Sequence, residues 1–275
     1  MPIKSKFNRM IAVLTAGILF LQSPSFAHEY WIEPINFSPA LGQQVSANLK
    51  VGSDLKGQSL AFIPQFTLSY QLMDAKGMLE LEGAAGDRPA LNFFPEQAGL
   101  NVIVYQTTKN RVTFSEWEVF EKYLVSEGMP EIIGRHRERG LPQTDFSESY
   151  SRYAKTLLDV DSTGTGNDAA TGMIIELVAM QNPYSLQPGE ELGIQLLYRG
   201  EPLADNQVSI FMQDQARTKE LVVERVRTDE NGQIKFVPEP GLMYLLNSIE
   251  IEEISGQGKL SWESFWASLT FMVPE

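Results

Sequence analysis

The chemistry open to this chain is bounded by its small supply of metal-binding and nucleophilic side chains. The 275 residues include no cysteine and only two histidines, His28 and His136. Thiolate metal sites, iron–sulfur clusters, disulfides and cysteine nucleophiles are therefore excluded, and a cage of several histidines cannot form within one chain. A transition-metal site would draw on one or both histidines, with carboxylates as further ligands.

His28 gains a second ligand atom if the residues before it are removed. Basic residues precede an uncharged apolar run at 10–21, and the small residues Ser25 and Ala27 follow where a signal peptidase requires them. This order predicts a secretory signal peptide over residues 1–27, cleaved after Ala27. The run is shorter than the roughly 20 apolar residues that cross a bilayer, and no longer one follows, so no transmembrane span is predicted in the mature chain.

Cleavage after Ala27 would make His28 the first residue of an exported, periplasmic protein. Its free α-amine and its imidazole could then chelate one ion, a donor pair that suits nickel, cobalt, copper and zinc. Glu29 or Glu33, in the run His-Glu-Tyr-Trp-Ile-Glu-Pro at 28–34, could add an oxygen ligand. The alternative is that His28 is simply the residue that follows a cleavage site.

His136 lies in a basic run, Arg-His-Arg-Glu-Arg at 135–139. Three neighbouring arginines disfavour a cation, so the first interpretation is a solvated helix C-terminus whose charges suit the helix dipole. The alternative is a copper oxidase in which His28 and His136 form a two-histidine brace. That alternative requires the two histidines to meet in the fold.

Charge and motif content argue against several other functions. Lys and Arg number 22 against 35 Asp and Glu, which gives a net charge of −13 and excludes nucleic-acid binding through a broad basic face. No Gly-x-Ser-x-Gly motif is present, and no carboxylate pair stands out among so many acidic residues. We therefore predict a protein that is not an enzyme.

Strand-like segments flank a polar, glycine-rich stretch at 161–171. Before it, residues 44–49, 65–72 and 100–107 alternate or are β-branched and aromatic, which predicts a small antiparallel sandwich. Helical periodicity follows at 117–125 and 130–139. The stripe at 150–158 fits a third helix, although residues 154–160 could instead close the sheet as a strand.

Seven further strands are predicted after residue 172, the last at 261–273, where Phe265, Ala267, Leu269 and Phe271 share one face. The predicted class is mainly β, with two tandem antiparallel β-sandwich domains of immunoglobulin or prealbumin type. The first domain covers 28–160 and is closed by a helical segment at 115–158. The linker is 161–171, and the second, prealbumin-like domain is 172–275.

Six segments, in order along nearly the whole mature chain, resemble one bacterial family. They lie at 28–34, 120–128, 148–155, 182–184, 197–203 and 262–271. The chain resembles periplasmic proteins of an uncharacterised domain type that are described as accessory components of nickel/cobalt uptake. The resemblance implies two β domains, a link to nickel or cobalt transport, and His28 as a metal ligand with Glu29 beside it.

These observations predict an exported metal-binding accessory protein that delivers nickel or cobalt, with copper as the alternative metal. The expected partner is a transporter or receptor protein of the cell envelope. A second interpretation is a non-catalytic β-sandwich adaptor, because tandem sandwiches with an acidic surface commonly serve as interaction modules.

Overall fold

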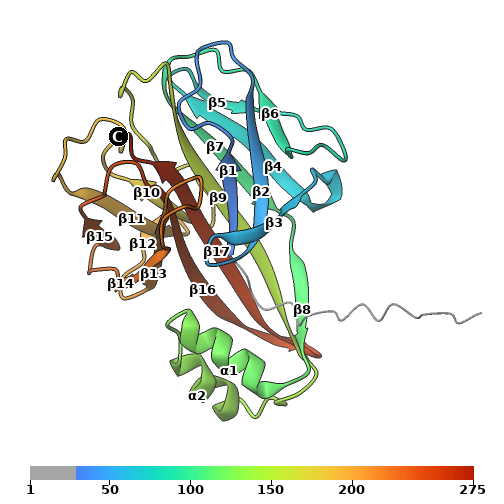
Figure 1. Ribbon diagram of the computed structural model, residues 1–275. Coiled ribbons are helices and arrows are strands. Elements are labelled where there is room, and N and C mark those ends of the chain that lie inside the picture. The colour runs from blue at the N-terminus through green and yellow to red at the C-terminus, as the bar shows by residue number, and fades with distance from the viewer. Residues whose placement is uncertain (1–28) are drawn as a thin grey trace, which may run out of the picture.

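The computed structural model describes residues 29–275 and confirms the mainly β class (Figure 1). Three β-sheets and two short helices make up this part of the chain. A nine-stranded sheet, called the central sheet, runs through the molecule, and the other two sheets and the helices pack on its two faces. Within residues 29–275 no helix has the length and apolar character needed to cross a membrane.

The central sheet has the strand order β14-β13-β16-β17-β9-β7-β4-β5, and β8 pairs with β9. Its strands are β4 (Thr67–Asp74), β5 (Gly77–Glu80), β7 (Gly99–Thr107), β8 (Asn110–Phe114), β9 (Phe146–Val160), β13 (Gln207–Gln213), β14 (Val222–Arg227), β16 (Met243–Gln257) and β17 (Leu260–Met272). All neighbours run antiparallel except β17 and β9, which are parallel. That parallel pair joins the two halves of the chain in one sheet.

Two smaller sheets cover opposite faces of the central sheet. The N-terminal sheet consists of β1 (Glu29–Pro34), β2 (Val45–Ser53), β3 (Lys56–Leu60) and β6 (Leu91–Phe93), and the turn η1 (Pro64–Phe66) follows it. The C-terminal sheet consists of β10 (Ile175–Ala179), β11 (Leu192–Tyr198), β12 (Glu201–Pro202) and β15 (Gln233–Phe236). Because strand side chains alternate, Ile103 and Tyr105 of β7 pack with the N-terminal sheet while Val102 and Val104 pack with the C-terminal sheet.

The helices α1 (Trp117–Ser126) and α2 (Glu131–Glu138) extend the layer formed by the N-terminal sheet. They cover Trp262 and Trp266 of β17, whereas Phe265 and Leu269 face the C-terminal sheet, so the predicted alternation in the last strand is confirmed. The two helices predicted at 117–125 and 130–139 are also confirmed. A seam therefore runs across the central sheet, between the N-terminal sheet and the helix pair.

The predicted helix at 150–158 is wrong, because these residues belong to the long strand β9. Both faces of β9 are covered, so apolar residues occur on both sides of the strand and mask the alternation of a half-exposed one. Tyr153 and Leu157 pack against the C-terminal sheet, and Ala154 and Leu158 pack against the N-terminal sheet. The apparent helical stripe arose from these two interleaved apolar faces.

The predicted linker at 161–171 contains no helix or strand, and it is fastened to the central sheet. The backbone N–H groups of Thr163 and Gly164 donate to the carboxylate of Asp159, and Leu100 N–H donates to the Thr165 carbonyl. Strands of both halves pair in the central sheet, on either side of this segment. Its role as a domain boundary stays a prediction.

Candidate metal centre

The predicted metal site rests on His28, which lies outside the described residues. Strand β1 begins at the next residue and pairs antiparallel with β2, with Glu29 opposite Gly52. Deeper along β1, the hydroxyl of Thr270 in β17 donates to the Ile32 carbonyl at 2.6 Å and ties the strand to the central sheet. The start of β1 at Glu29 is therefore the part of the structure nearest in sequence to His28.

Glu29 carries a carboxylate that the protein does not fully compensate. Burial is the main reason that the pKa of Glu29 is raised to about 8, and the negative charges of Glu127 and Asp54 contribute to the rise. Arg225 acts in the opposite direction, but this side chain is exposed. The Oε2 atom of Glu29 is buried and has no hydrogen-bond partner among the described residues. A cation beside this oxygen would stabilise the ionised form.

Glu127 brings a second carboxylate from the end of α1, where it is the C-terminal cap residue. Burial raises the pKa of Glu127 to about 7, and the hydroxyl of Ser126 donates to its carboxylate at 3.4 Å. Gly128 follows with a φ of 75°, the left-handed conformation that commonly ends a helix. The negative charge of Glu127 contributes to the raised pKa of Glu29, so the two carboxylates interact electrostatically.

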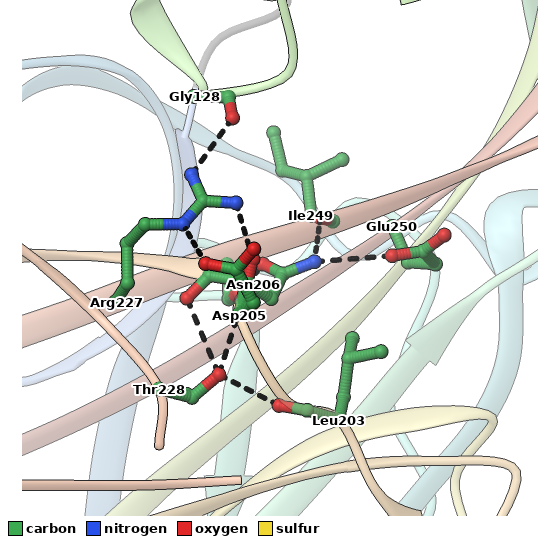
Figure 2. A network of polar contacts seen from close by, with 9 residues as sticks. Gly128, Leu203, Asp205, Asn206, Arg227, Thr228, Ile249 and Glu250 are labelled. Atoms are coloured by element: carbon green, nitrogen blue, oxygen red, sulfur yellow. Dashed lines mark hydrogen bonds and ion pairs between the residues drawn. The ribbon is translucent and has the colours of Figure 1, made fainter. Parts of the chain in front are cut away.

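Side chains of the second half hold the end of α1 in place. Arg227 of β14 donates to the Gly128 carbonyl at 3.0 Å and pairs with Asp205 at 2.5 Å (Figure 2). Gln207 of β13 donates to the Ser126 carbonyl at 2.8 Å. Two consecutive contacts therefore bracket Glu127 and fix its backbone against the central sheet.

The loop that carries Asp205 is itself anchored by Asn206, whose side chain lies at the centre of Figure 2. Its amide donates to the Ile249 carbonyl at 3.1 Å and to Glu250 at 3.0 Å. The Thr228 hydroxyl accepts from the Asn206 N–H at 3.0 Å and donates to the Leu203 carbonyl at 2.7 Å. The loop that pairs with Arg227 through Asp205 is therefore itself hydrogen-bonded to β16 and to Thr228.

A row of polar residues crosses the central sheet along the seam. Arg225, Ser209, Asn247 and Ser268 are register neighbours on β14, β13, β16 and β17. Asn247 lies between Leu245, which packs under the N-terminal sheet, and Ile249, which packs under the helices. Both amide atoms of Asn247 and the hydroxyl of Ser268 are buried without a partner among the described residues. Buried polar atoms of this kind point to water or an ion in the seam.

Glu33, the other carboxylate predicted as a ligand, is already engaged by the protein. It pairs with Arg217 at 2.7 Å, lies 4.0 Å from Lys50 and accepts the indole N–H of Trp31 at 3.0 Å. These contacts direct it toward the loop after β13 rather than toward Glu127. A metal at Glu33 would have to displace an arginine.

His136 is fully buried, so the predicted solvated helix end is wrong at this position. Its Nδ1 accepts the indole N–H of Trp262 at 3.0 Å, and its Nε2 lies 3.0 Å from the Pro142 carbonyl, to which it donates as the neutral tautomer. Burial lowers the pKa of His136, and the charges of Arg139 and Arg137 lower it further. With both nitrogens bonded, His136 serves helix packing, and this arrangement does not offer it as a metal ligand.

Within residues 29–275 no group of three or more His, Asp or Glu side chains is arranged to hold a metal. Glu127 acts electrostatically on Glu29, whereas Glu33 and His136 have protein partners of their own. Glu127, Asn247 and Ser268 were not predicted from the sequence. The one available signal was an Asn-Ser pair in the middle of the apolar strand 243–251.

A family model described as "Domain of unknown function (DUF4198)" matches residues 25–250. That description names no metal, so it supports an uncharacterised family and says nothing of nickel or cobalt. No curated protein matches the chain.

Several solved structures share a low similarity with the chain. The D0–D1 domain of intimin covers 88% of this chain and 97% of its own length, with 10% identity and a TM-score of 0.21. A tetra-tandem repeat in the extending region of a large adhesion protein covers 89% of this chain, with 9% identity and a TM-score of 0.22, and the chain spans 49% of its length. A Salmonella alpha-2-macroglobulin mutant covers 94% of this chain and 16% of its own length, with 10% identity and a TM-score of 0.21.

Proposed function

This chain belongs to the DUF4198 family, and we propose that it is an exported periplasmic protein that binds a transition metal at the start of β1. His28 would supply its α-amine and imidazole, and Glu29 and Glu127 would supply carboxylate oxygens. The observation that supports the proposal is that Glu29, the residue after His28, has a buried oxygen with no partner among residues 29–275 and a raised pKa to which the charge of Glu127 contributes.

The donor set fits a divalent transition metal. Two neighbouring carboxylates with one exposed arginine as counter-charge are unfavourable when buried, and a cation between them would remove that penalty. Amine, imidazole and carboxylate donors suit nickel and cobalt, and also copper. The buried Oε2 of Glu29, which has no partner among residues 29–275, is the oxygen best placed to accept a metal.

The proposed role is delivery of nickel or cobalt in uptake, rather than catalysis. So few protein ligands would leave coordination positions open, and a metal held in this way can pass to another protein. The acceptor would be a transporter or receptor protein of the cell envelope. We propose no enzymatic step for the site.

The test is calorimetric titration of the mature protein, with its start at His28 verified by intact mass, with Ni²⁺, Co²⁺ and Cu²⁺. One glycine placed before His28 blocks the amine chelate and should weaken binding at least about tenfold, or ~1.4 kcal/mol. Glu29→Gln should weaken it by a similar factor. The matched control is Glu33→Gln, on the same strand, which should leave the affinity unchanged.

Unchanged affinity in the extended protein would overturn the role of His28. Absence of binding by all three metals would overturn the proposal and favour the adaptor alternative, which predicts a stable protein partner in periplasmic pull-downs. Copper binding that is lost in His136→Ala would instead favour the oxidase.

A further inference from the structure

A cavity of about 250 Å³ lies beside β1, apart from the carboxylates of the candidate metal centre. It is lined by residues of β1, β7, β9 and the η1 turn, among them Tyr30, Phe66, Tyr105, Tyr150 and Arg152. The volume is below the roughly 300–1,000 Å³ of sites for drug-sized ligands, so its occupant would be a small metabolite.

Arg152 places a positive charge in this mostly apolar cavity. Its guanidinium carbon lies 5.1 Å from the ring centroid of Tyr30 and 4.8 Å from that of Tyr150. Cation–π contacts on two rings orient the guanidinium and leave its N–H edge for a ligand. Burial lowers the pKa of Arg152, whose Nε atom is buried.

Among residues 29–275 no negative charge balances Arg152. Within residues 29–275 no carboxylate forms an ion pair with it, and its buried Nε has no hydrogen-bond acceptor. None of the residues that line the cavity is acidic, although the chain carries a net charge of −13. A second arginine, Arg88, lies at the rim, where it donates to the Ser59 carbonyl at 2.8 Å.

We propose that this cavity binds a small organic carboxylate with an apolar or aromatic body. A carboxylate accepts two parallel N–H bonds from one guanidinium, the pairing that Arg152 lacks. Tyrosine, phenylalanine and aliphatic side chains would enclose the rest of the ligand. Inorganic phosphate fits less well, because one buried guanidinium and apolar walls leave most of its oxygens without donors. The proposal does not rest on metal binding.

The test is calorimetric titration of the mature protein with benzoate, with benzamide as a matched probe of the same shape and no charge. Benzoate should bind saturably and at least about tenfold more tightly than benzamide. Arg152→Met should weaken benzoate binding by about the same factor, and Arg152→Lys, which keeps the charge without the planar fork, should fall between. The control is Arg111→Met, which removes an exposed arginine of β8 outside the cavity and should change nothing.

Several outcomes would overturn this assignment. They are equal affinity for benzoate and benzamide, full benzoate affinity in Arg152→Met, or no binding of benzoate or hexanoate up to about 20 mM, a limit near 2 kcal/mol of binding free energy. Displacement of benzoate by equimolar phosphate would show a general oxyanion site and contradict the organic carboxylate. The benzoate and benzamide comparison uses the unmodified protein, so it stands even if Arg152→Met fails to fold. Loss of metal binding alone would leave this site intact.

Discussion

Strand β9 carries two cations, three residues apart, in opposite electrostatic surroundings. Lys155 is fully buried beneath the C-terminal sheet, with its Nζ 2.7 Å from Asp168 and 3.9 Å from Glu176, and it donates to the Ala169 carbonyl at 3.0 Å. Arg152 points to the other face and packs between two tyrosine rings with no carboxylate partner among residues 29–275. The charge of Lys155 is neutralised by carboxylates of the protein. The charge of Arg152 has no such partner among residues 29–275 and is available to a ligand.

Strand β1 shows the same contrast between two glutamates. Glu33 is engaged by Arg217, Lys50 and Trp31, whereas Glu29 has a buried oxygen without a partner among residues 29–275 and a pKa raised to about 8. A buried charge with a built-in partner ties elements of the fold together. A buried charge without one is costly to the fold, which makes it a candidate binding group.

The largest expected effect comes from removing the compensated cation. Lys155→Met would leave Asp168 and Glu176 buried without their counter-charge, and we expect a loss of about 3–5 kcal/mol in the free energy of unfolding. Arg152→Met removes a charge that has no ionic partner and should cost about 1 kcal/mol or less, mainly through the cation–π contacts. Urea unfolding of both variants at pH 7 measures the difference.

Equal losses of unfolding free energy in Lys155→Met and Arg152→Met would contradict this distinction, because they would show that both cations stabilise the fold alike. Arg111→Met, an exposed change on β8, sets the baseline for removing an arginine from the surface.

A second effect concerns Glu148, a fully buried carboxylate at the helix end of β9. It accepts from the hydroxyls of Ser264 and Tyr123, and burial raises its pKa to about 7. Because the folded state binds this proton more tightly than the unfolded chain, the stabilisation is complete below pH ~4.3 and is lost as pH rises to about 7. Glu148→Gln should therefore gain about 2–3 kcal/mol relative to the unmodified protein between pH 5 and pH 8.

Urea unfolding at both pH values tests this expectation. The control is Glu263→Gln on β17, a carboxylate paired with exposed Lys109, whose effect should be small at either pH. A constant difference between Glu148→Gln and the unmodified protein across the pH range would show that Glu148 is ionised in the fold throughout.

The sequence allowed many of the strands and the two helices to be predicted, because their periodicity and turn residues are local, but β1, β3, β6 and β8 were not predicted. The parallel pairing of β9 with β17 could not be predicted, since it joins residues more than a hundred positions apart, such as Arg152 and Trp266. The misassigned segment 150–158 has the same origin, because only the covering of both faces explains its pattern.

The residues of the candidate sites also differ in whether local sequence was enough to predict them. His28 and Glu29 were predicted because a cleavage site lies next to them in the sequence. Glu127 and Arg152 were not, because a charge without a partner is recognisable only after the surrounding elements are in place. The burial of His136 was missed for the same reason, since its partner Trp262 comes from the last strand.

A smaller effect should appear in the pH dependence of metal affinity, where Glu29 differs from Glu33. With the pKa of Glu29 raised to about 8 and that of Glu127 to about 7, protons compete with the metal at neutral pH. Nickel affinity should rise at least about tenfold from pH 6.5 to pH 8. Glu29→Gln should reduce this slope and Glu33→Gln should keep it, as measured by competition with a chelator of known pH dependence.

The smallest expected effect tests how Glu127 is positioned. Arg227 and Asp205 are both largely exposed, so Arg227→Ala should cost at most about 1 kcal/mol in the free energy of unfolding. The same change releases the Gly128 carbonyl next to Glu127 (Figure 2), and nickel affinity should fall about two- to threefold, or ~0.5 kcal/mol. Arg199→Ala, which breaks a similarly exposed pair with Glu252, is the matched control and should leave nickel affinity unchanged. If both variants alter nickel affinity equally, or neither does, the contacts on either side of Glu127 do not position it as a ligand. A loss confined to Arg227→Ala would place the end of α1 in the metal site.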